Sequence, residues 1–299
     1  MTNNQTLFFC IGAQKSATTW LHLELNKSPD VFLAPPKEIN YWNVVRSPFM
    51  GEYRLLTRRR LTPRRDNSWK GIVKRTIDGS FFSEWREREL LIQRYNSIFE
   101  SDPRIHQSYL EYIGIGENNN RLCGDVSPYY ALLSSRTYRE MSECHPDTKF
   151  IYIIRDPVDR LWSGVAQRFR HNFAAGQFKD IDHERLFREA LEDYFHLDFQ
   201  LSNYKRTIQN LRTAVPFDNI VILFFETLID PNVVDEREKL QKFLNIPSID
   251  LDVSRVAYWG TSDSKISSEL RGLARERLQF VYDFVGDAVS ADLPARWST

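Results

Sequence analysis

The sequence predicts an α/β fold in which helices flank a central parallel β-sheet. Short apolar runs such as Leu7–Ile11 and Phe150–Ile154 alternate with amphipathic segments, which is the pattern of a parallel sheet with helical crossovers. Two of these runs lead into polar turns, GAQKSATTW at 12–20 and RDPVDRLWS at 155–163, and each turn opens a helix. The backbone N–H groups at such helix starts are unpaired, so both turns are candidate anion sites.

The individual elements follow from apolar periodicity and from turn residues. Strands are expected at Leu7–Ile11, Asp30–Leu33, Arg121–Asp125, Phe150–Ile154 and Ile220–Phe225. Helices are expected at Thr18–Asn26, Ser83–Phe99, Val158–Phe169, Glu184–Phe195, Asn203–Ala214, Asp235–Phe243 and Ser268–Val285. The stretch from about 43 to 120 interrupts the alternation, and we expect a helical and loop cap inserted into one domain spanning 1–299.

Composition narrows the class of protein. The 299 residues carry 40 basic and 40 acidic side chains, a balance that does not favour nucleic acid or membrane as a partner. No stretch approaches the roughly 20 apolar residues of a membrane span. The three cysteines do not form a disulfide framework, and no Cys or His pair has metal-ligand spacing. We therefore expect a cytoplasmic protein with reduced thiols and no metal site, whose oligomeric state the sequence leaves open.

The first polar turn has the composition of a phosphate or sulfate site. Lys15 and the hydroxyls of Ser16, Thr18 and Thr19 lie on one loop that leads into a helix. The nucleotide kinase pattern G-x-x-x-x-G-K-[ST] fits poorly, because Lys15 comes only three residues after Gly12 and the second glycine is missing.

The segment K-S-A-T-T-W-L resembles the 5′-phosphosulfate loop of sulfotransferases that use 3′-phosphoadenosine-5′-phosphosulfate (PAPS), whose usual form is K-S-G-T-T-x-L. The resemblance implies a P-loop-like fold and PAPS as sulfate donor, with PAP as product. It also implies nucleotide contacts from Gln14, Lys15, Ser16, Ala17, Thr18, Thr19 and Trp20. Ala17 replaces the family's glycine, and it should be tolerated if this position lies in the first turn of the helix.

The second polar turn resembles the 3′-phosphate motif of the same family, R-[DN]-P-x-[DE]-R-x-x-S. Arg155, Asp156, Pro157, Arg160 and Ser163 all fit. An Arg at a strand end and a Ser on the next helix can converge on one anion, since guanidinium geometry matches phosphate. By analogy, Arg155 and Ser163 bind the 3′-phosphate.

Two further segments resemble the carbohydrate-type branch of the family, which includes the heparan sulfate sulfotransferases. PPKEINYW at 35–42 and CGDVSPYY at 123–130 match its K-E-x-x-[YF] and G-[DE]-x-[ST]-P-x-Y patterns, and NIVILFFETL at 219–228 matches its late strand. Val126 stands where some relatives carry a catalytic Lys. The resemblance implies acceptor-binding roles for Lys37, Trp42, Asp125 and Ser127.

The catalytic roles also follow from the resemblance. Lys15 would stabilise the leaving phosphate, and Glu38 would be the general base that activates the acceptor. Alternatively, Glu38 is a loop carboxylate paired with Lys37. The rival base is His106, which lies in the expected cap but lacks the pattern found around the histidine of the phenol and steroid branch.

The acceptor is less defined than the donor. Nine basic residues and one acid between Arg54 and Arg75 suggest an anionic glycan or, alternatively, a solvated loop. Lys265 precedes the last helix, where relatives close a loop over the nucleotide. We expect sulfation of a hydroxyl or amine on a carbohydrate-like acceptor. A phenolic, lipid or small-metabolite acceptor, and a non-catalytic nucleotide- or glycan-binding protein, are the alternatives.

Overall fold

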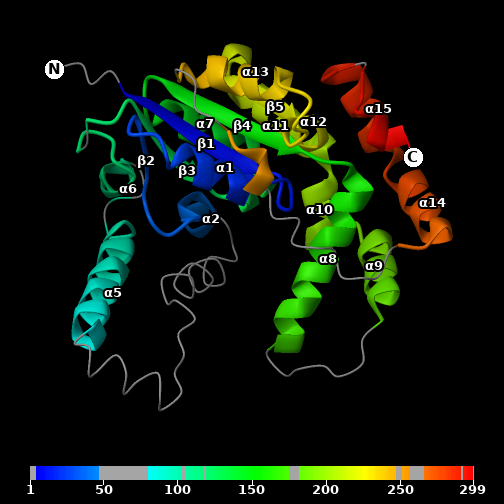
Figure 1. Cartoon of the computed structure of the whole chain (residues 1–299), viewed down its shortest axis with the longest axis horizontal. Coiled ribbons are helices and arrows are strands. Elements are labelled where there is room, and N and C mark those ends of the chain that lie inside the picture. The colour runs from blue at the N-terminus through cyan, green and yellow to red at the C-terminus, as the bar shows by residue number, and fades with distance from the viewer. Residues whose placement is uncertain are drawn as a thin grey trace.

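The computed structural model describes residues 5–46, 80–100, 102, 105–117, 119–174, 182–246, 251–255, 266–290 and 292–298. Its centre is a five-stranded sheet, shown with its surrounding helices in Figure 1. The strands are β1 (Thr6–Gly12), β2 (Val31–Leu33), β3 (Leu122–Val126), β4 (Thr148–Ile154) and β5 (Ile220–Phe224). All neighbouring pairs are parallel, in the order β2-β3-β1-β4-β5. The predicted fold class is therefore confirmed, and each strand lies within two residues of its expected bounds.

Helices surround the sheet. They are α1 (Thr18–Leu25), α2 (Tyr41–Arg46), α5 (Ser80–Ser97), α6 (Gln107–Tyr112), α7 (Ser135–Glu143), α8 (Pro157–Ala174), α9 (His183–Glu192), α10 (Leu197–Ser202), α11 (Tyr204–Ala214), α12 (Phe225–Leu228), α13 (Asp235–Leu244), α14 (Ser268–Arg277) and α15 (Gln279–Ala288). Short 3-10 turns occur at Pro128–Leu132 (η1), Phe217–Asn219 (η2), Val253–Arg255 (η3) and Ala295–Ser298 (η4).

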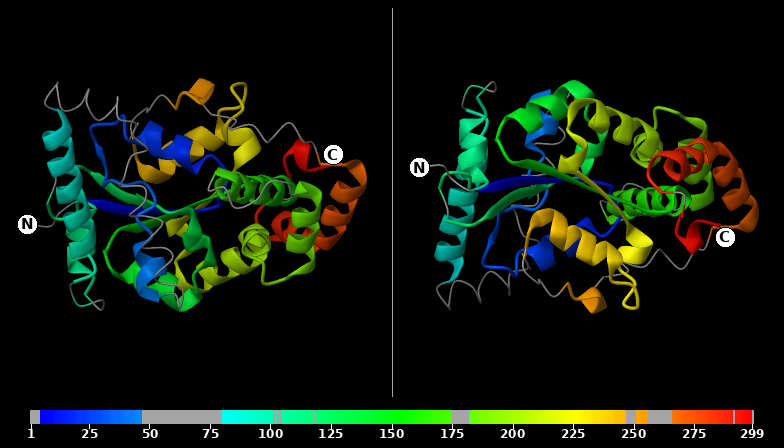
Figure 2. Two further views of the ribbon diagram at one scale, coloured as in Figure 1. Left: turned by 90° about the horizontal axis from the view of Figure 1, so that it is seen from below. Right: turned by 90° about the horizontal axis from the view of Figure 1, so that it is seen from above.

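The sheet is buried on both faces, which explains why its strands read as continuous apolar runs. Along β1, Phe9 packs into one core cluster with residues of α7, α8 and α11, whereas Phe8 and Cys10 pack into a second cluster with α1 and α13. Figure 2 shows these two layers of helices on opposite sides of the sheet. Successive strand side chains thus alternate between two cores rather than between core and water.

The strand order places a switch point between β1 and β4. From β1 the chain builds β2 and β3 on one side, and then crosses to β4 and β5 on the other. In open parallel sheets ligands bind outside the carboxyl ends of the strands at such a point. The loops that follow β1 and β4 are the two polar turns singled out in the sequence, so the topology brings them to one crevice.

One predicted helix is two helices in the structure. The expected Ser268–Val285 helix breaks at Leu278, whose φ of −101° and ψ of 7° end α14 before α15 begins. Leu278 is fully buried, and the change of direction lets Leu270 of α14 and Val281 of α15 pack into the same core cluster. Tertiary packing sets this break, because no Gly or Pro marks it in the sequence.

Sequence periodicity also missed α2, α6, α7, α10 and α12, which are all nine residues or shorter. Of these, α7 carries a readable start signal, since Ser134 Oγ accepts a hydrogen bond from the N–H of Thr137. The single-domain assignment and the cap boundary at 43–120 stay predictions. In the described part of that stretch, Tyr95 of α5 and Tyr109 of α6 belong to the same core cluster as β1.

Candidate active site

The loop between β1 and α1 is shaped by left-handed backbone conformations. Gly12 has a φ of 147°, and a Cβ there would lie 3.1 Å from the carbonyl oxygen of Pro128. Lys15 and Ala17 have φ values of 72° and 58°. Left-handed residues in a short loop turn successive N–H groups toward one concave side, which is a recurring way to bind anions.

The condition under which Ala17 should be tolerated, a place in the first turn of α1, is not met. Ala17 immediately precedes the helix, with φ 58° and ψ 17°. A Cβ costs about 1 kcal/mol or more in this left-handed region. The family's glycine therefore has a backbone reason at this position, and this chain accommodates strain there.

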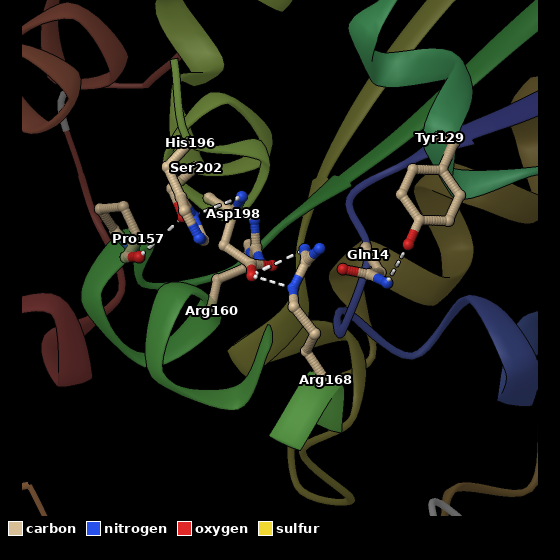
Figure 3. A network of polar contacts seen from close by, with 8 residues as sticks. All are labelled: Gln14, Tyr129, Pro157, Arg160, Arg168, His196, Asp198 and Ser202. Carbon is tan, nitrogen blue, oxygen red and sulfur yellow. Dashed lines mark hydrogen bonds and ion pairs between the residues drawn. The ribbon is translucent and has the colours of Figure 1, made fainter. Parts of the chain in front are cut away.

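Two polar atoms of the loop are prepared for a ligand. Ser16 is fully buried, and its Oγ has no hydrogen-bond partner in the described chain. The Oε1 of Gln14 is likewise buried without a partner, while its Nε2 donates to the hydroxyl of Tyr129 at 3.1 Å (Figure 3). An unpartnered buried polar atom is costly unless a ligand or water satisfies it. Thr18 is buried and Thr19 is exposed.

Trp20 has a visible structural role. Its indole N–H donates to the carbonyl of Asp252 at 2.8 Å, and the N–H of Asp252 donates to Glu24 at 3.0 Å. The Trp20 ring is 4 % exposed and packs in the core cluster beside α13. These contacts hold residues 251–255 on α1. A nucleotide contact by Trp20 stays a prediction.

The second polar turn meets the first. Arg155 directly follows β4, and its Nη1 donates to the carbonyl of Lys15 at 3.2 Å. Its guanidinium lies 4.9 Å from the ring centre of Phe225. The main chain of Arg155 is fixed by Tyr204, whose hydroxyl donates to its carbonyl at 2.8 Å and accepts from its N–H at 3.4 Å. Two segments 140 residues apart are thus joined at the switch point.

Ser163 lies on α8, 4 % exposed, and shares no hydrogen bond with Arg155 in the described chain. Arg160 of the same motif is fully buried and structural. It donates to the carbonyl and to Oδ1 of Asp198, at 2.7 and 2.8 Å, while Arg168 donates to Oδ2 of Asp198 at 3.1 and 2.9 Å (Figure 3). Gly164 makes room, since a Cβ there would lie 2.1 Å from Arg160 Nη2. Sequence reasoning did not find Asp198 or Arg168.

The turn itself is also braced. Asp156 accepts hydrogen bonds from the hydroxyl of Tyr282 at 2.7 Å and from the N–H of Asp159 at 2.9 Å. Its own N–H donates to Glu226, which follows β5, at 2.8 Å. Burial raises the pKa of both carboxyls, and these hydrogen bonds oppose the rise. Arg155 and Asp156 are therefore held by side chains from three other segments, namely Tyr204, Glu226 and Tyr282.

The segment with the expected base lies after β2. Glu38 and Asn40 both have left-handed backbones, with φ values of 64° and 56°. The Nζ of Lys37 lies 2.8 Å from Oε1 of Glu38, and both side chains are less than one-fifth exposed. The pairing that we considered as an alternative for Glu38 is therefore present, in a partly buried setting.

Asp125 and Ser127 form a buried network, and their acceptor-binding role stays a prediction. Ser127 Oγ donates to Asp125 at 2.6 Å and accepts from the N–H of Asn40 at 3.1 Å. Tyr130 and Tyr109 donate to the other carboxylate oxygen at 2.6 and 2.9 Å. Burial raises the pKa of Asp125, and the three donors oppose it. The network fixes the segment that carries Glu38.

Trp42 is also enclosed by the core, and its contact with the acceptor stays a prediction. Its side chain is fully buried, with its ring centre 4.3 Å from that of His106. His106 is itself 5 % exposed and shares a hydrogen bond of 3.0 Å with the hydroxyl of Tyr41. Burial lowers its pKa. Both residues are buried, and His106 as the rival base stays an alternative prediction. Lys265 and the basic segment 54–75 lie outside the described residues.

The fold and the crevice define a class: an α/β protein with a P-loop-like anion cradle after β1 and an arginine after β4. The sequence matches the family model described as "Sulfotransferase family" over residues 8–250. The chain belongs to this family and is a sulfotransferase enzyme.

Solved structures of other proteins are similar to this chain. A sulfotransferase from Alicyclobacillus acidocaldarius is similar with a TM-score of 0.59 and 19 % identity, over 99 % of each chain. The sulfotransferase domain of a Synechococcus PCC 7002 olefin synthase has a TM-score of 0.46 and 16 % identity, over 97 % of this chain and 96 % of its own. A search of curated protein sequences gave no significant match. In the described part of the chain, no helix has the length and apolar character needed to cross a membrane.

Proposed function

We propose that this enzyme transfers the sulfuryl group of PAPS to a hydroxyl or amine of a carbohydrate-like acceptor. The loop at 14–20 would bind the 5′-phosphosulfate end, and Arg155 with Ser163 the 3′-phosphate. The observation that carries the proposal is the contact of Arg155 with the Lys15 carbonyl beside the unpartnered Ser16 hydroxyl. A cation and a buried donor then face one crevice, as a nucleotide with two anionic ends requires.

These residues fit PAPS by their chemistry. PAPS supplies the activated sulfuryl group, and the protein supplies positioning and charge. Lys15 follows a glycine turn and stands in a left-handed conformation at the anion cradle. A fixed cation beside an oxygen that gains charge stabilises the transition state. Ser16 adds a hydroxyl donor that is already desolvated, so it needs no rearrangement to reach a bound oxygen.

Glu38 is the proposed general base. The Lys37 ammonium at 2.8 Å favours the charged carboxylate, which is the form that accepts a proton from an acceptor hydroxyl. The buried network of Asp125 and Ser127 holds the N–H of Asn40, two residues on. Asn40 Nδ2 in turn donates to the carbonyl of Glu38 at 2.9 Å. The main chain that carries Glu38 would therefore be held in place by hydrogen bonds to the core.

Transfer of labelled sulfate from PAPS to a panel of glycans, phenols, lipids and small metabolites tests the donor and the acceptor class together. We expect the glycans to be labelled. Labelling of phenols or lipids alone would replace the carbohydrate acceptor with those classes. In thermal-shift assays PAP should stabilise the protein more than ATP with Mg²⁺, and the opposite order would contradict PAPS as donor.

Two variants test the catalytic roles. Lys15→Ala and Glu38→Gln should each reduce kcat by about 10²–10³-fold. Glu38→Gln should retain PAP binding, because Glu38 is not among the residues proposed to hold the nucleotide. Sulfation that survives both changes would overturn this mechanism. Arg185→Gln, an exposed charge change on α9, is the matched control.

A further inference from the structure

A second cationic groove lies away from the switch point, where the turn after α9 meets the start of α11 and the junction of α14 with α15. Figure 2 shows these helices side by side at one end of the molecule. The groove has a volume of about 470 Å³. That is within the range of small-molecule sites, roughly 300–1,000 Å³. None of the described residues that line it is acidic.

Three cations line the groove: Lys205, Arg206 and Arg277. Within the described residues none of them forms an ion pair with a carboxylate. Arg206 Nη2 donates to the carbonyl of Leu132 and Arg277 Nε to that of Leu191, so these bonds leave their charges unneutralised. The chain as a whole balances 40 basic residues with 40 acidic ones, so three cations without a described carboxylate partner around one hollow are a local excess. One guanidinium nitrogen of Arg206, Nη1, is buried without a hydrogen-bond partner. Such a group is stabilised by a bound anion.

The floor and walls of the groove are built from fixed groups. Asn203 is 3 % exposed, and its Oδ1 accepts from the N–H of Arg206 at 3.2 Å while its Nδ2 donates to the hydroxyl of Tyr194 at 3.4 Å. The rings of Tyr194 and Phe199 are 5.6 Å apart, and those of Phe199 and Phe280 are 6.4 Å apart. Aromatic walls favour a flat apolar body over a small hydrated ion.

The groove is separate from the nucleotide crevice. Asn203 stands at the corner between α10 and α11, and its two neighbours face the other way. Ser202 donates to the carbonyl of Pro157 at 3.1 Å, and Tyr204 holds the main chain of Arg155. A ligand in the groove would therefore lie behind the wall that supports the 3′-phosphate site, without occupying that site.

We propose that this groove binds a planar organic anion, an aromatic ring that carries a sulfonate, sulfate, carboxylate or phosphate group. The ring packs against the accessible rings of Tyr194 and Phe280, with the buried Phe199 behind them. The charged group meets Lys205, Arg206 and Arg277. This site is independent of the donor and of the acceptor proposed above.

Calorimetric titration of the full chain with 2-naphthalenesulfonate tests the site, with saturating PAP to fill the nucleotide crevice. The neutral 2-naphthalenesulfonamide and inorganic sulfate are the comparison ligands. We expect the sulfonate to bind, and each comparison ligand to bind at least about tenfold more weakly because it lacks either the charge or the ring.

The double variant Lys205→Gln/Arg277→Gln should weaken sulfonate binding by about tenfold or more. Arg185→Gln removes a charge from α9 outside the groove and should leave binding unchanged. Equal binding by the double variant, displacement of the sulfonate by PAP, sulfate binding as tight as the sulfonate, or no sulfonate binding would each overturn the proposal. Melting temperatures of all variants show whether a loss reflects the site or the fold.

Discussion

The loop at 12–20 and the turn at 155–163 meet at one crevice but are built in different ways. The loop owes its shape to its own backbone, with left-handed residues at Lys15 and Ala17 and a Ser16 hydroxyl left without a partner. The turn owes its shape to distant side chains, since Tyr204, Glu226 and Tyr282 hold its main chain and Asp156. A local sequence motif can predict the first kind of anion site, whereas the second kind of site depends on contacts made by the whole fold.

The largest expected effect comes from removing Asp198, which supports the turn at 155–163 through its ion pair with Arg160. Asp198→Ala leaves Arg160 buried and unpaired, and loss of one partner of a buried ion pair costs about 3–5 kcal/mol. Urea unfolding at neutral pH measures the loss. Arg168→Gln removes the half-exposed arginine from the same carboxylate and should cost about 1 kcal/mol or less. Equal losses in the two variants would show that Arg160 is not the residue that needs Asp198.

The next effect distinguishes the 3′-phosphate site at Arg155 from the loop at 12–20 by comparing the binding of two nucleotides, PAP and AMP. Arg155→Met should weaken binding of PAP by about 10–100-fold, the value of one charge-assisted phosphate contact. It should hardly change binding of AMP, which lacks the 3′-phosphate.

Ser16→Ala is the matched change in the loop. It should weaken the binding of PAP and the binding of AMP by a similar factor of about five. Calorimetry with both nucleotides measures the two variants. If Arg155→Met weakened the binding of AMP as much as that of PAP, the contact of Arg155 with the Lys15 carbonyl would contribute more to binding than a contact with the 3′-phosphate.

A smaller effect tests the strain in the loop. Ala17→Gly should raise the free energy of unfolding by about 0.5–1 kcal/mol, because relief of the left-handed strain exceeds the entropy that glycine adds to the unfolded chain. The control Ala214→Gly, at the end of α11, should lower it by a similar amount. Thermal unfolding compares the two, and destabilisation by Ala17→Gly would contradict the left-handed assignment.

The last effect concerns the pH dependence of stability. Burial lowers the pKa of His22 on α1 from 6.5 to about 4, with the nearby Lys37 adding to the shift and Glu38 opposing it. Between these values the unfolded chain binds a proton that the folded chain does not, so the free energy of unfolding falls as pH drops from 6.5 toward 4.

His22→Gln should remove that part of the pH dependence, which urea unfolding between pH 4 and 7 measures. His145→Gln, in the loop before β4, removes an imidazole elsewhere. If the two variants flattened the profile equally, His22 would not be the group responsible.

The fold was largely predictable because its signals are local. Each apolar run of the sheet is buried on both faces, so hydrophobicity alone marked the strands within two residues. The missed helices are short and are stabilised by packing, which leaves little periodicity to detect. The break at Leu278 had no signal because a buried leucine there is compatible with either a straight or a broken helix.

The candidate site was predictable where a motif keeps its residues together. Gln14, Lys15 and Ser16 lie on one loop, and Arg155 follows a strand that pairs with β1. Residue type alone did not show which of the predicted acceptor contacts are buried. Asp125, Ser127 and Trp42 have the chemistry of acceptor contacts, but the core encloses them. Asp198 gave no signal, because its partner Arg160 lies 38 positions away.

By itself the sequence determined the parallel α/β fold, the family to which the chain belongs, and the two polar turns that meet at the crevice. These features depend on local hydrophobicity and on short motifs, which can be recognised in the sequence without knowledge of tertiary contacts. Only the tertiary structure decided that Ala17 is left-handed, that Asp125 supports the Glu38 segment from the core, and that three cations share a groove behind Tyr204. Those outcomes depend on which distant side chains become neighbours, and on which polar groups then lose access to water.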